Sequence, residues 1–404
     1  MSVTVLRDRA FRGFLASDIL SGFGVGLSTI GANWYVLMQT GESRHVGGLL
    51  VVNVVAGFLS SLVSGVLTDR FARRNVILAM HLARLAMALM IGGALLLFGF
   101  QLYLLYVFAG LNGAGWTIYM AASRSLAQEL TPKDEYVSAN SLLEVSLQVG
   151  MFVAGAASGF VYKYAGFAEI MLVTAAMYGV GAGAIKLVRA TAVAVPADRP
   201  SYVTMLSQGF RFLRSHPATF VIGAVSIVPL VVTMLFNVVL PGYVSHDLGG
   251  DSVVFGFGDM SYGVGGLIAG LTVAWIAARL SPKRLVLAFF GLSAAVLGLL
   301  GWNSLVVGLY IGCVGLGLTN SAIRILMNSL IMERVPEEYM GRAMTVWLGV
   351  SLGLQCLFSI FFSSYLDRAG AGVGFALMAA LMVVGLIGFI VVNRVDSRNA
   401  QTAG

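Results

Sequence analysis

Ionisable side chains set inside apolar stretches are the part of this sequence best able to do chemistry. Three acids and three arginines stand out: Asp18, Glu144, Asp259, Arg84, Arg124 and Arg324. A charged group within a membrane-spanning stretch costs roughly 3 kcal/mol, so such residues mark functional sites. A carboxylate partly withdrawn from water can take up and release a proton, and a guanidinium can hold a carboxylate or another anion. These six residues could therefore take part in proton exchange or in ion pairing.

Asp18 is the strongest candidate for proton exchange, because it lies about two turns inside the first apolar run. The competing interpretation is a permanent ion pair that only holds helices together. The partner in that pair would be Arg84, Arg124 or Arg324.

Glu144 is a second candidate for proton coupling, but a structural ion pair with Arg124 is favoured. Both residues are expected at the same level of the membrane, on neighbouring helices. Gln148 follows one turn later on the same helix face and could extend this network or line a cavity. Arg84 and Arg124 are predicted to serve as structural ion-pair partners.

Signatures of an enzyme, a metal site or a cofactor are missing from the sequence. The two cysteines show no metal-ligand spacing, and the four histidines are scattered. Gly22-Phe-Gly24-Val-Gly26 superficially matches a dinucleotide-binding loop, but no strand precedes it. No phosphate-binding loop for ATP is present. We therefore expect neither catalysis nor a bound cofactor.

Composition narrows the class of protein to an integral membrane protein. The 404 residues are 58% hydrophobic and only 11% charged, whereas a soluble domain carries about 25% charged residues. Disordered chains are polar, which excludes disorder. The net charge of +7 is better explained by basic loops of a membrane protein than by nucleic-acid binding.

The apolar runs predict an all-α protein with twelve membrane crossings. Each run is long enough to span a bilayer at about 20 residues per crossing. The runs cover residues 12–38, 46–67, 75–97, 102–123, 139–162, 167–188, 219–244, 253–278, 285–301, 305–328, 342–365 and 372–393.

The positions of lysine and arginine predict that both termini lie in the cytoplasm. Most of the 25 basic residues fall between alternate runs, on the side that also holds the termini. The loops on the other side carry only Arg44, Lys163 and Arg368. Basic residues are retained on the cytoplasmic face, so this asymmetry sets the orientation.

The sequence divides into two six-helix halves at residues 1–188 and 219–404. The segment 189–218 between them is predicted to be a cytoplasmic linker, in which residues 202–213 have the spacing of an amphipathic helix on the inner leaflet. Weak internal repeats support the two halves. Pro132 to Tyr136 resembles Pro336 to Tyr339, at the same place in each half.

Gly65-Val-Leu-Thr-Asp69-Arg-Phe-Ala-Arg73-Arg74, between the second and third runs, resembles the cytoplasmic loop motif of the major facilitator superfamily. The sequence departs from the motif at Ala72, where glycine is usual. The resemblance covers the whole chain and implies the twelve-helix major facilitator fold. It also implies that this loop latches the two halves together in one transport state. The latch residues would be Gly65, Asp69, Arg70, Arg73, Arg74 and Glu129.

The resemblance further implies that the first, fourth, seventh and tenth helices line a central substrate cavity. Their aromatic and amide side chains suit a bulky amphipathic solute. Together with Gln148, the lining residues would be Asn33, Trp34, Asn112, Trp116, Tyr119, Phe236, Asn237, Tyr243, Tyr310, Asn320 and Arg324.

Within the superfamily, the segments from Ser123 to Pro132 and from Asn237 to Pro241 resemble enterobactin exporters and macrolide efflux proteins. The expected function is export of a siderophore or drug-like molecule by a proton-coupled antiporter. A lysophospholipid flippase or an uptake carrier is the alternative with the same fold, and a non-transporting sensor or assembly partner is the alternative of another class. A monomer in a bacterial inner membrane is expected, with no nucleic-acid partner.

Overall fold

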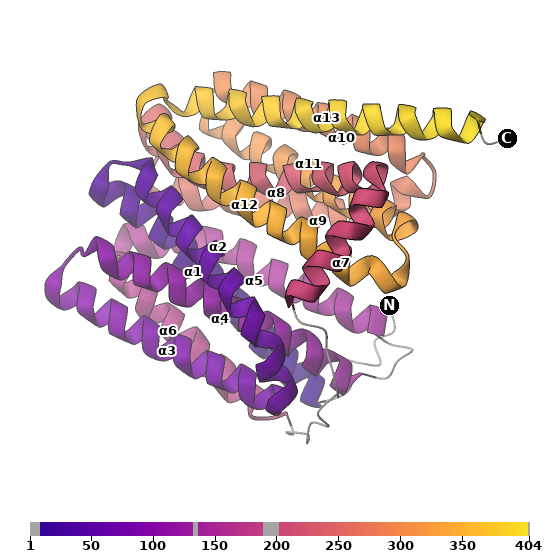
Figure 1. Ribbon diagram of the computed structural model, residues 1–404. Coiled ribbons are helices and arrows are strands. Elements are labelled where there is room, and N and C mark those ends of the chain that lie inside the picture. The colour runs from indigo at the N-terminus through magenta and orange to yellow at the C-terminus, as the bar shows by residue number, and fades with distance from the viewer. Residues whose placement is uncertain (1–8, 132–135, 189–201, 403–404) are drawn as a thin grey trace. The chain divides into compact units, whose positions relative to one another are not determined.

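The computed structural model describes residues 9–131, 136–188 and 202–402, and it is helical almost throughout (Figure 1). The predicted linker segment 189–201 therefore lies outside the described residues. Two compact units are formed. The first comprises Met1–Asp198 with Gly250–Met260, and the second comprises Arg199–Gly249 with Ser261–Gly404.

The first unit is built from six helices and the first turns of a seventh. They are α1 (Arg9–Thr40), α2 (Ser43–Arg70), α3 (Arg73–Phe98), α4 (Leu102–Leu130), α5 (Tyr136–Tyr164), α6 (Phe167–Ile185) and the start of α9 (Ser252–Ala277).

The second unit holds the rest of α9 and the remaining helices. They are α7 (Tyr202–Ser215), α8 (Pro217–Gly242), the π-helical turn η3 (Tyr243–Asp247), α10 (Pro282–Trp302), α11 (Val306–Arg334), α12 (Glu337–Ala369) and α13 (Ala371–Thr402).

Eleven helices of the described residues are long and apolar enough to cross a membrane. The prediction of an all-α membrane protein is confirmed to that extent, and the number twelve stays a prediction. Two described helices lie outside this set, namely α7, which has only 14 residues, and α4, which has 29. The length of α4 would allow it to cross a membrane. Its apolar character is diluted by Asn112, Trp116 and several tyrosines. The orientation of the termini also stays a prediction.

Close backbone contacts hold the first unit together. In that unit α1 packs against α5 and α6, and α2 packs against α4. Gly22 and Gly26 of α1 lie against α5, where an added methyl group would be 3.1 Å from the Leu147 carbonyl oxygen and 2.8 Å from the Ala154 side chain. Gly113 of α4 is tighter still, because a methyl group there would collide with the Asn53 backbone of α2.

Two apolar clusters form the core of the first unit, and α1 runs through both. Phe11 and Phe14 belong to one cluster, and Leu27 to Leu37 contribute to the other. Between the two clusters, α1 carries three polar residues, Ser17, Asp18 and Ser21, and all three are fully buried. The core therefore encloses a polar layer at this point.

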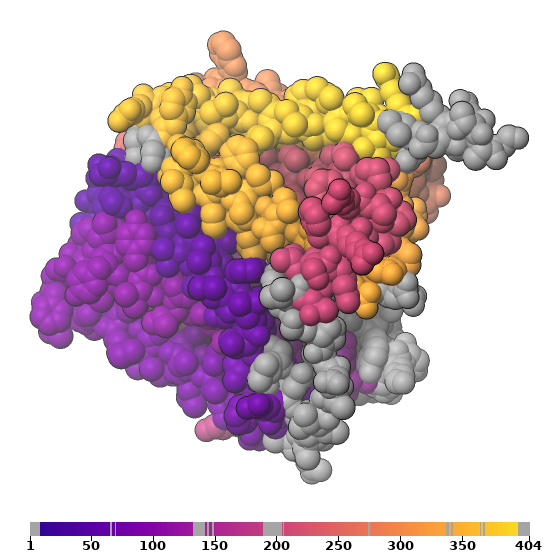
Figure 2. All heavy atoms as spheres, viewed as in Figure 1, coloured from indigo at the N-terminus to yellow at the C-terminus, as the bar shows by residue number. Residues whose placement is uncertain are grey.

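In the second unit α7 packs against α12, and α8 packs against α12 and α13. α7 covers the segment in which an amphipathic helix was predicted. Phe212 and Leu213 are buried, whereas Leu206 and Phe210 are exposed. Figure 2 shows α7 on the surface of this unit, beside α12. Its position on the inner leaflet remains a prediction.

Replacement of Gly113 by alanine tests the α2–α4 contact. The added methyl group would meet backbone atoms of Asn53, which cannot move without displacing α2. We expect Gly113→Ala to lower the free energy of unfolding by about 1–3 kcal/mol, as overpacking does. Unfolding of the purified protein in detergent measures this value.

Gly93→Ala is the matched control, because an added methyl group at Gly93 of α3 meets nothing within 4 Å. Alanine is favoured over glycine in a helix by about 0.5–1 kcal/mol, so this variant should be neutral or slightly more stable. Equal stability of the two variants would show that the contact at Gly113 is unimportant.

Candidate functional site

Asp18 is the centre of a buried polar site in the first unit. Its side chain is fully buried, and its carboxylate accepts three hydrogen bonds from hydroxyl groups. Tyr119 and Ser123 donate to Oδ1 at 2.9 and 3.1 Å. Ser146 donates to Oδ2 at 2.7 Å. A buried carboxylate needs such donors, since an unpaired charge in an apolar interior is very costly.

Regular helix geometry explains how these donors converge on Asp18. Tyr119 and Ser123 are four residues apart on α4, so they lie on one face of that helix. Ser146 comes from α5, which packs against α1. Three helices therefore contribute to the surroundings of one carboxylate.

Ser146 has two acceptors for its single hydroxyl hydrogen. Its Oγ lies 2.7 Å from Asp18 Oδ2 and 2.8 Å from the carbonyl oxygen of Leu143. A hydroxyl can donate one hydrogen bond at a time and accept others. When Asp18 is ionised, Ser146 can therefore donate its hydrogen to the carboxylate. When Asp18 carries a proton, Ser146 can donate to the Leu143 carbonyl oxygen instead and accept the hydrogen of Asp18.

Arg84 of α3 lies in the same layer and is almost completely buried, with 2% exposure. Its Nη1 donates to Ser21 at 3.2 Å, and not to Asp18. The guanidinium also lies over the ring of Tyr119, whose hydroxyl donates to Asp18. The structure therefore connects Arg84 to Asp18 through Tyr119 rather than by a direct ion pair.

Aromatic rings surround the Arg84 guanidinium. Its central carbon lies 5.8, 5.7 and 5.5 Å from the ring centres of Trp116, Tyr119 and Tyr178. Contacts of this kind stabilise a desolvated cation. Among the described residues, no hydrogen-bond acceptor meets the Nε and Nη2 atoms of Arg84. The guanidinium therefore has unused donor capacity.

His81 is a member of this site that the sequence analysis did not identify. It lies one turn before Arg84 on α3, and a ring nitrogen is 2.8 Å from the Ser17 hydroxyl. Its ring also meets the edge of Tyr119 at 5.4 Å. The available signal was the spacing of His81 and Arg84 on one face of a helix. We call the set Ser17, Asp18, Ser21, His81, Arg84, Tyr119, Ser123 and Ser146 the buried polar cluster.

The remaining cavity candidates of the first unit have mixed environments. Asn33 and Trp34 are buried, and Trp34 stacks on Phe255 at 5.2 Å. Asn112 is buried and donates to Thr29 at 3.1 Å. Trp116 is partly exposed and stacks on the buried Tyr119. Asp259 lies partly buried near Gly155.

The predicted cavity residues of the second unit also differ in how far they are buried. Phe236 and Tyr243 are buried, and Tyr243 donates to the Asn303 carbonyl oxygen at 2.7 Å. Asn320 is buried as well. It donates to Thr233 and Tyr262 at 3.2 and 3.3 Å.

Three further candidates of this unit are more accessible. Asn237 and Tyr310 are partly exposed, and Arg324 is exposed.

The predicted latch is described only in part. Arg73 and Glu129 form an ion pair, with 2.9 Å between Nη1 and Oε2. Arg74 donates to the Val188 carbonyl oxygen at 3.3 Å. Arg70 is exposed.

The surroundings of four candidate residues lie outside the description. Gly65 and Asp69 lie in α2, and Glu144 and Gln148 lie in α5. Nothing is described of their side-chain environments, so the predicted Glu144–Arg124 pair stays a prediction.

The Arg73–Glu129 pair predicts a measurable coupling between α3 and α4. The two side chains are 28% and 14% exposed, so we expect a coupling energy of about 1 kcal/mol, at the upper end for surface pairs. A double-mutant cycle with Arg73→Gln and Glu129→Gln, measured by unfolding in detergent, gives this value.

Arg70→Gln serves as the control, because Arg70 is a neighbouring exposed arginine. Its loss should change the unfolding free energy by less than about 0.5 kcal/mol. A coupling energy near zero between Arg73 and Glu129 would contradict a stabilising role for the pair.

The sequence matches one protein family and is similar to two transporters over most of its length. The sequence profile of the Major Facilitator Superfamily matches residues 14–348 and 228–403. The chain is 23% identical over 390 residues to the multidrug efflux pump Tap of Mycolicibacterium fortuitum, covering 92% of this chain and 93% of that protein. It is also 23% identical over 396 residues to the enterobactin exporter EntS of Escherichia coli, covering 94% and 92%.

Solved structures give the same picture of the fold. The nucleoside transporter NupG matches with a TM-score of 0.75 at 13% identity, covering 97% of this chain and 99% of that one. At this identity the likeness concerns the fold alone.

Proposed function

The chain belongs to the Major Facilitator Superfamily, and we propose that it is a proton-coupled exporter of a small amphipathic molecule that works by alternating access. It is a multi-pass membrane protein that transports a solute rather than an enzyme. Its end-to-end similarity to a multidrug efflux pump and to an enterobactin exporter supports export. The substrate class we propose is a drug-like molecule or a siderophore.

The observation that carries the proposal is the environment of Asp18. The carboxylate is buried, yet its hydrogen-bond donors are hydroxyl groups rather than a directly bound arginine. Hydroxyl groups can reverse their roles, because they accept hydrogen bonds as well as donate them. A site of this kind tolerates both the ionised and the protonated carboxyl, which a proton carrier must do.

Ser146 supplies the local change that accompanies protonation. When Asp18 binds a proton, Ser146 can rotate its hydroxyl hydrogen toward Leu143 and accept the new O–H of Asp18. No heavy atom has to move for this exchange. The cost of changing the protonation state in a tightly packed core is thereby reduced.

The accessible aromatic and amide residues are the proposed substrate contacts. Tyr119 and Phe236 are buried, so each would act by packing within its own unit rather than by touching the solute. Trp116, Asn237 and Tyr310 are partly exposed and could touch the solute. The exposed Arg324 would favour an anionic or hydroxyl-rich substrate.

Replacement of Asp18 by asparagine separates proton coupling from substrate movement. We expect Asp18→Asn to reduce transport driven by a pH gradient by at least about tenfold, because the side chain can no longer bind and release the proton. Exchange of substrate across the membrane without a gradient should persist. Proteoliposomes loaded with enterobactin, or with a fluorescent lipophilic dye, measure both activities.

Asp251→Asn is the matched control, because Asp251 is a carboxylate outside the membrane-spanning segments. The Lys163 ammonium holds its pKa below the usual value. This variant should transport normally. Unchanged gradient-driven transport in Asp18→Asn would disprove the role of Asp18. Movement of lysophospholipid but of neither probe would instead support a flippase, and failure of every probe would favour the non-transporting alternative.

A further inference from the structure

Two adjoining cavities in the second unit lie outside the proposed transport site. The first, which we call the α7–α12 cavity, has a volume of about 600 Å³ and includes Arg211, Arg342 and Tyr339 in its lining. The second, the α8–α13 cavity, has a volume of about 690 Å³ and includes Arg334 and Val391. Both are described entirely by residues of this unit.

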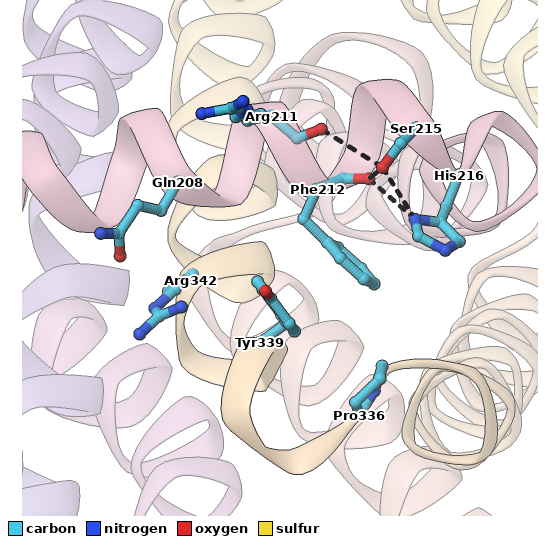
Figure 3. Close-up of a pocket in the computed structure, with 8 residues that line it drawn as sticks. All are labelled: Gln208, Arg211, Phe212, Ser215, His216, Pro336, Tyr339 and Arg342. Carbon is cyan, nitrogen blue, oxygen red and sulfur yellow. Dashed lines mark hydrogen bonds between the residues drawn. The ribbon is translucent and has the colours of Figure 1, made fainter.

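The α7–α12 cavity is built around a stack of four side chains. His216 stacks on Phe212 at 4.4 Å, Phe212 stacks on Tyr339 at 4.6 Å, and Arg342 lies 5.3 Å from the Tyr339 ring centre. Figure 3 shows Phe212 reaching from α7 toward Tyr339, with Gln208 and Arg342 extending on the same side of α7. The stack holds the Arg342 guanidinium at this cavity, and the Gln208 amide lines the same cavity.

His216 lines both cavities. Its Nδ1 lies 3.0 Å from the Phe212 carbonyl oxygen and 3.1 Å from the Ser215 hydroxyl. In the tautomer with the hydrogen on Nδ1, that nitrogen donates to the carbonyl oxygen, which can only accept. Nε2 is then the nitrogen available to a ligand, either as an acceptor or, in the protonated ring, as a donor.

The lining of the α8–α13 cavity is mostly apolar. Pro217, Val221 and Val392 line it, and Arg334 provides a cation beside them. Val391 is 53% exposed, and Ile387 and Val384 continue an exposed apolar strip along α13 with exposures of 55% and 62%. The apolar surface therefore runs from Arg334 along an exposed face of α13, a helix long and apolar enough to cross a membrane.

From these features we infer that the two cavities form one binding site for an anionic glycerophospholipid. The phosphate would lie with Arg334 and Arg342 on either side of His216, and an acyl chain would follow the apolar strip of α13. A guanidinium offers paired donors that fit phosphate oxygens. A free anion would contact only the arginines, and an uncharged lipid would contact only the apolar strip. An anionic phospholipid is the ligand that would use both features.

Acidic residues near the site limit the local positive charge. Glu333 precedes Arg334 and is exposed. Glu337 and Glu338 begin α12, and their side chains lie outside the description. The site is therefore defined by the placement of its arginines rather than by a large excess of positive charge.

Lipid retention by the full-length protein tests the inference. Native mass spectrometry of protein in detergent, with added phosphatidylglycerol or phosphatidylcholine, measures the bound fraction of each lipid. We expect phosphatidylglycerol to bind more tightly, and Arg334→Gln or Arg342→Gln to weaken it about fivefold each. Arg214→Gln on α7 is the control, because Arg214 is exposed and does not line either cavity.

A second pair of variants tests the acyl chain. Val391→Gln places a polar group in the α8–α13 cavity and should weaken phosphatidylglycerol binding. Val307→Gln makes the same change at an exposed valine of α11, outside the α13 strip and lining neither cavity, and should not. Unfolding curves without added lipid establish that each variant is folded.

Three results would overturn the inference. Equal retention of the two lipids would exclude headgroup recognition. An equal effect of Arg214→Gln would mean that binding reflects only the general surface charge. Inorganic phosphate or glycerol phosphate that stabilises the protein as much as the lipid does, with no effect of Val391→Gln, would identify a free-anion site instead.

Discussion

The burial of Asp18 is the constraint on which the organisation of the first unit depends. A carboxylate in an apolar interior must be given hydrogen-bond donors from elsewhere in the fold. Asp18 obtains them from α4 and α5, so α1 cannot shift along either helix without breaking these bonds. Two glycines of α1 also help to satisfy the Asp18 carboxylate. Gly22 and Gly26 allow α5 to approach α1 closely enough for Ser146 to reach Oδ2 of Asp18.

The sequence was sufficient to predict an all-α membrane protein, and it singled out Asp18 as a candidate. Low charge and long apolar runs require a helical membrane protein, and Asp18 stands out because few acids lie inside those runs. The family followed from one loop motif, and the profile match confirms it. These features are local in the sequence, so they can be read without coordinates.

The partners of Asp18 could not be predicted in the same way. The sequence offered an arginine partner only in the competing interpretation of Asp18 as a permanent ion pair. The structure instead supplies Tyr119, Ser123 and Ser146, which are common residues whose positions around Asp18 depend on how α1, α4 and α5 are rotated. His81 was missed for the same reason. Its relation to Ser17 depends on the packing of α3, which no pattern within a single helix reports.

The charge of the buried polar cluster links proton binding to a change of conformation, given the proposed function. The Arg84 guanidinium stays protonated at any accessible pH. With Asp18 ionised and His81 neutral, the cluster carries no net charge. Binding of a proton to Asp18 leaves the charge of Arg84 uncompensated within the buried layer, and an uncompensated buried charge is unfavourable. Access to water or an anion would relieve this cost, because the Nε and Nη2 atoms of Arg84 have no acceptor among the described residues. Under the proposed function, protonation would therefore favour an open cluster over a closed one, which is the coupling that a proton-driven carrier requires.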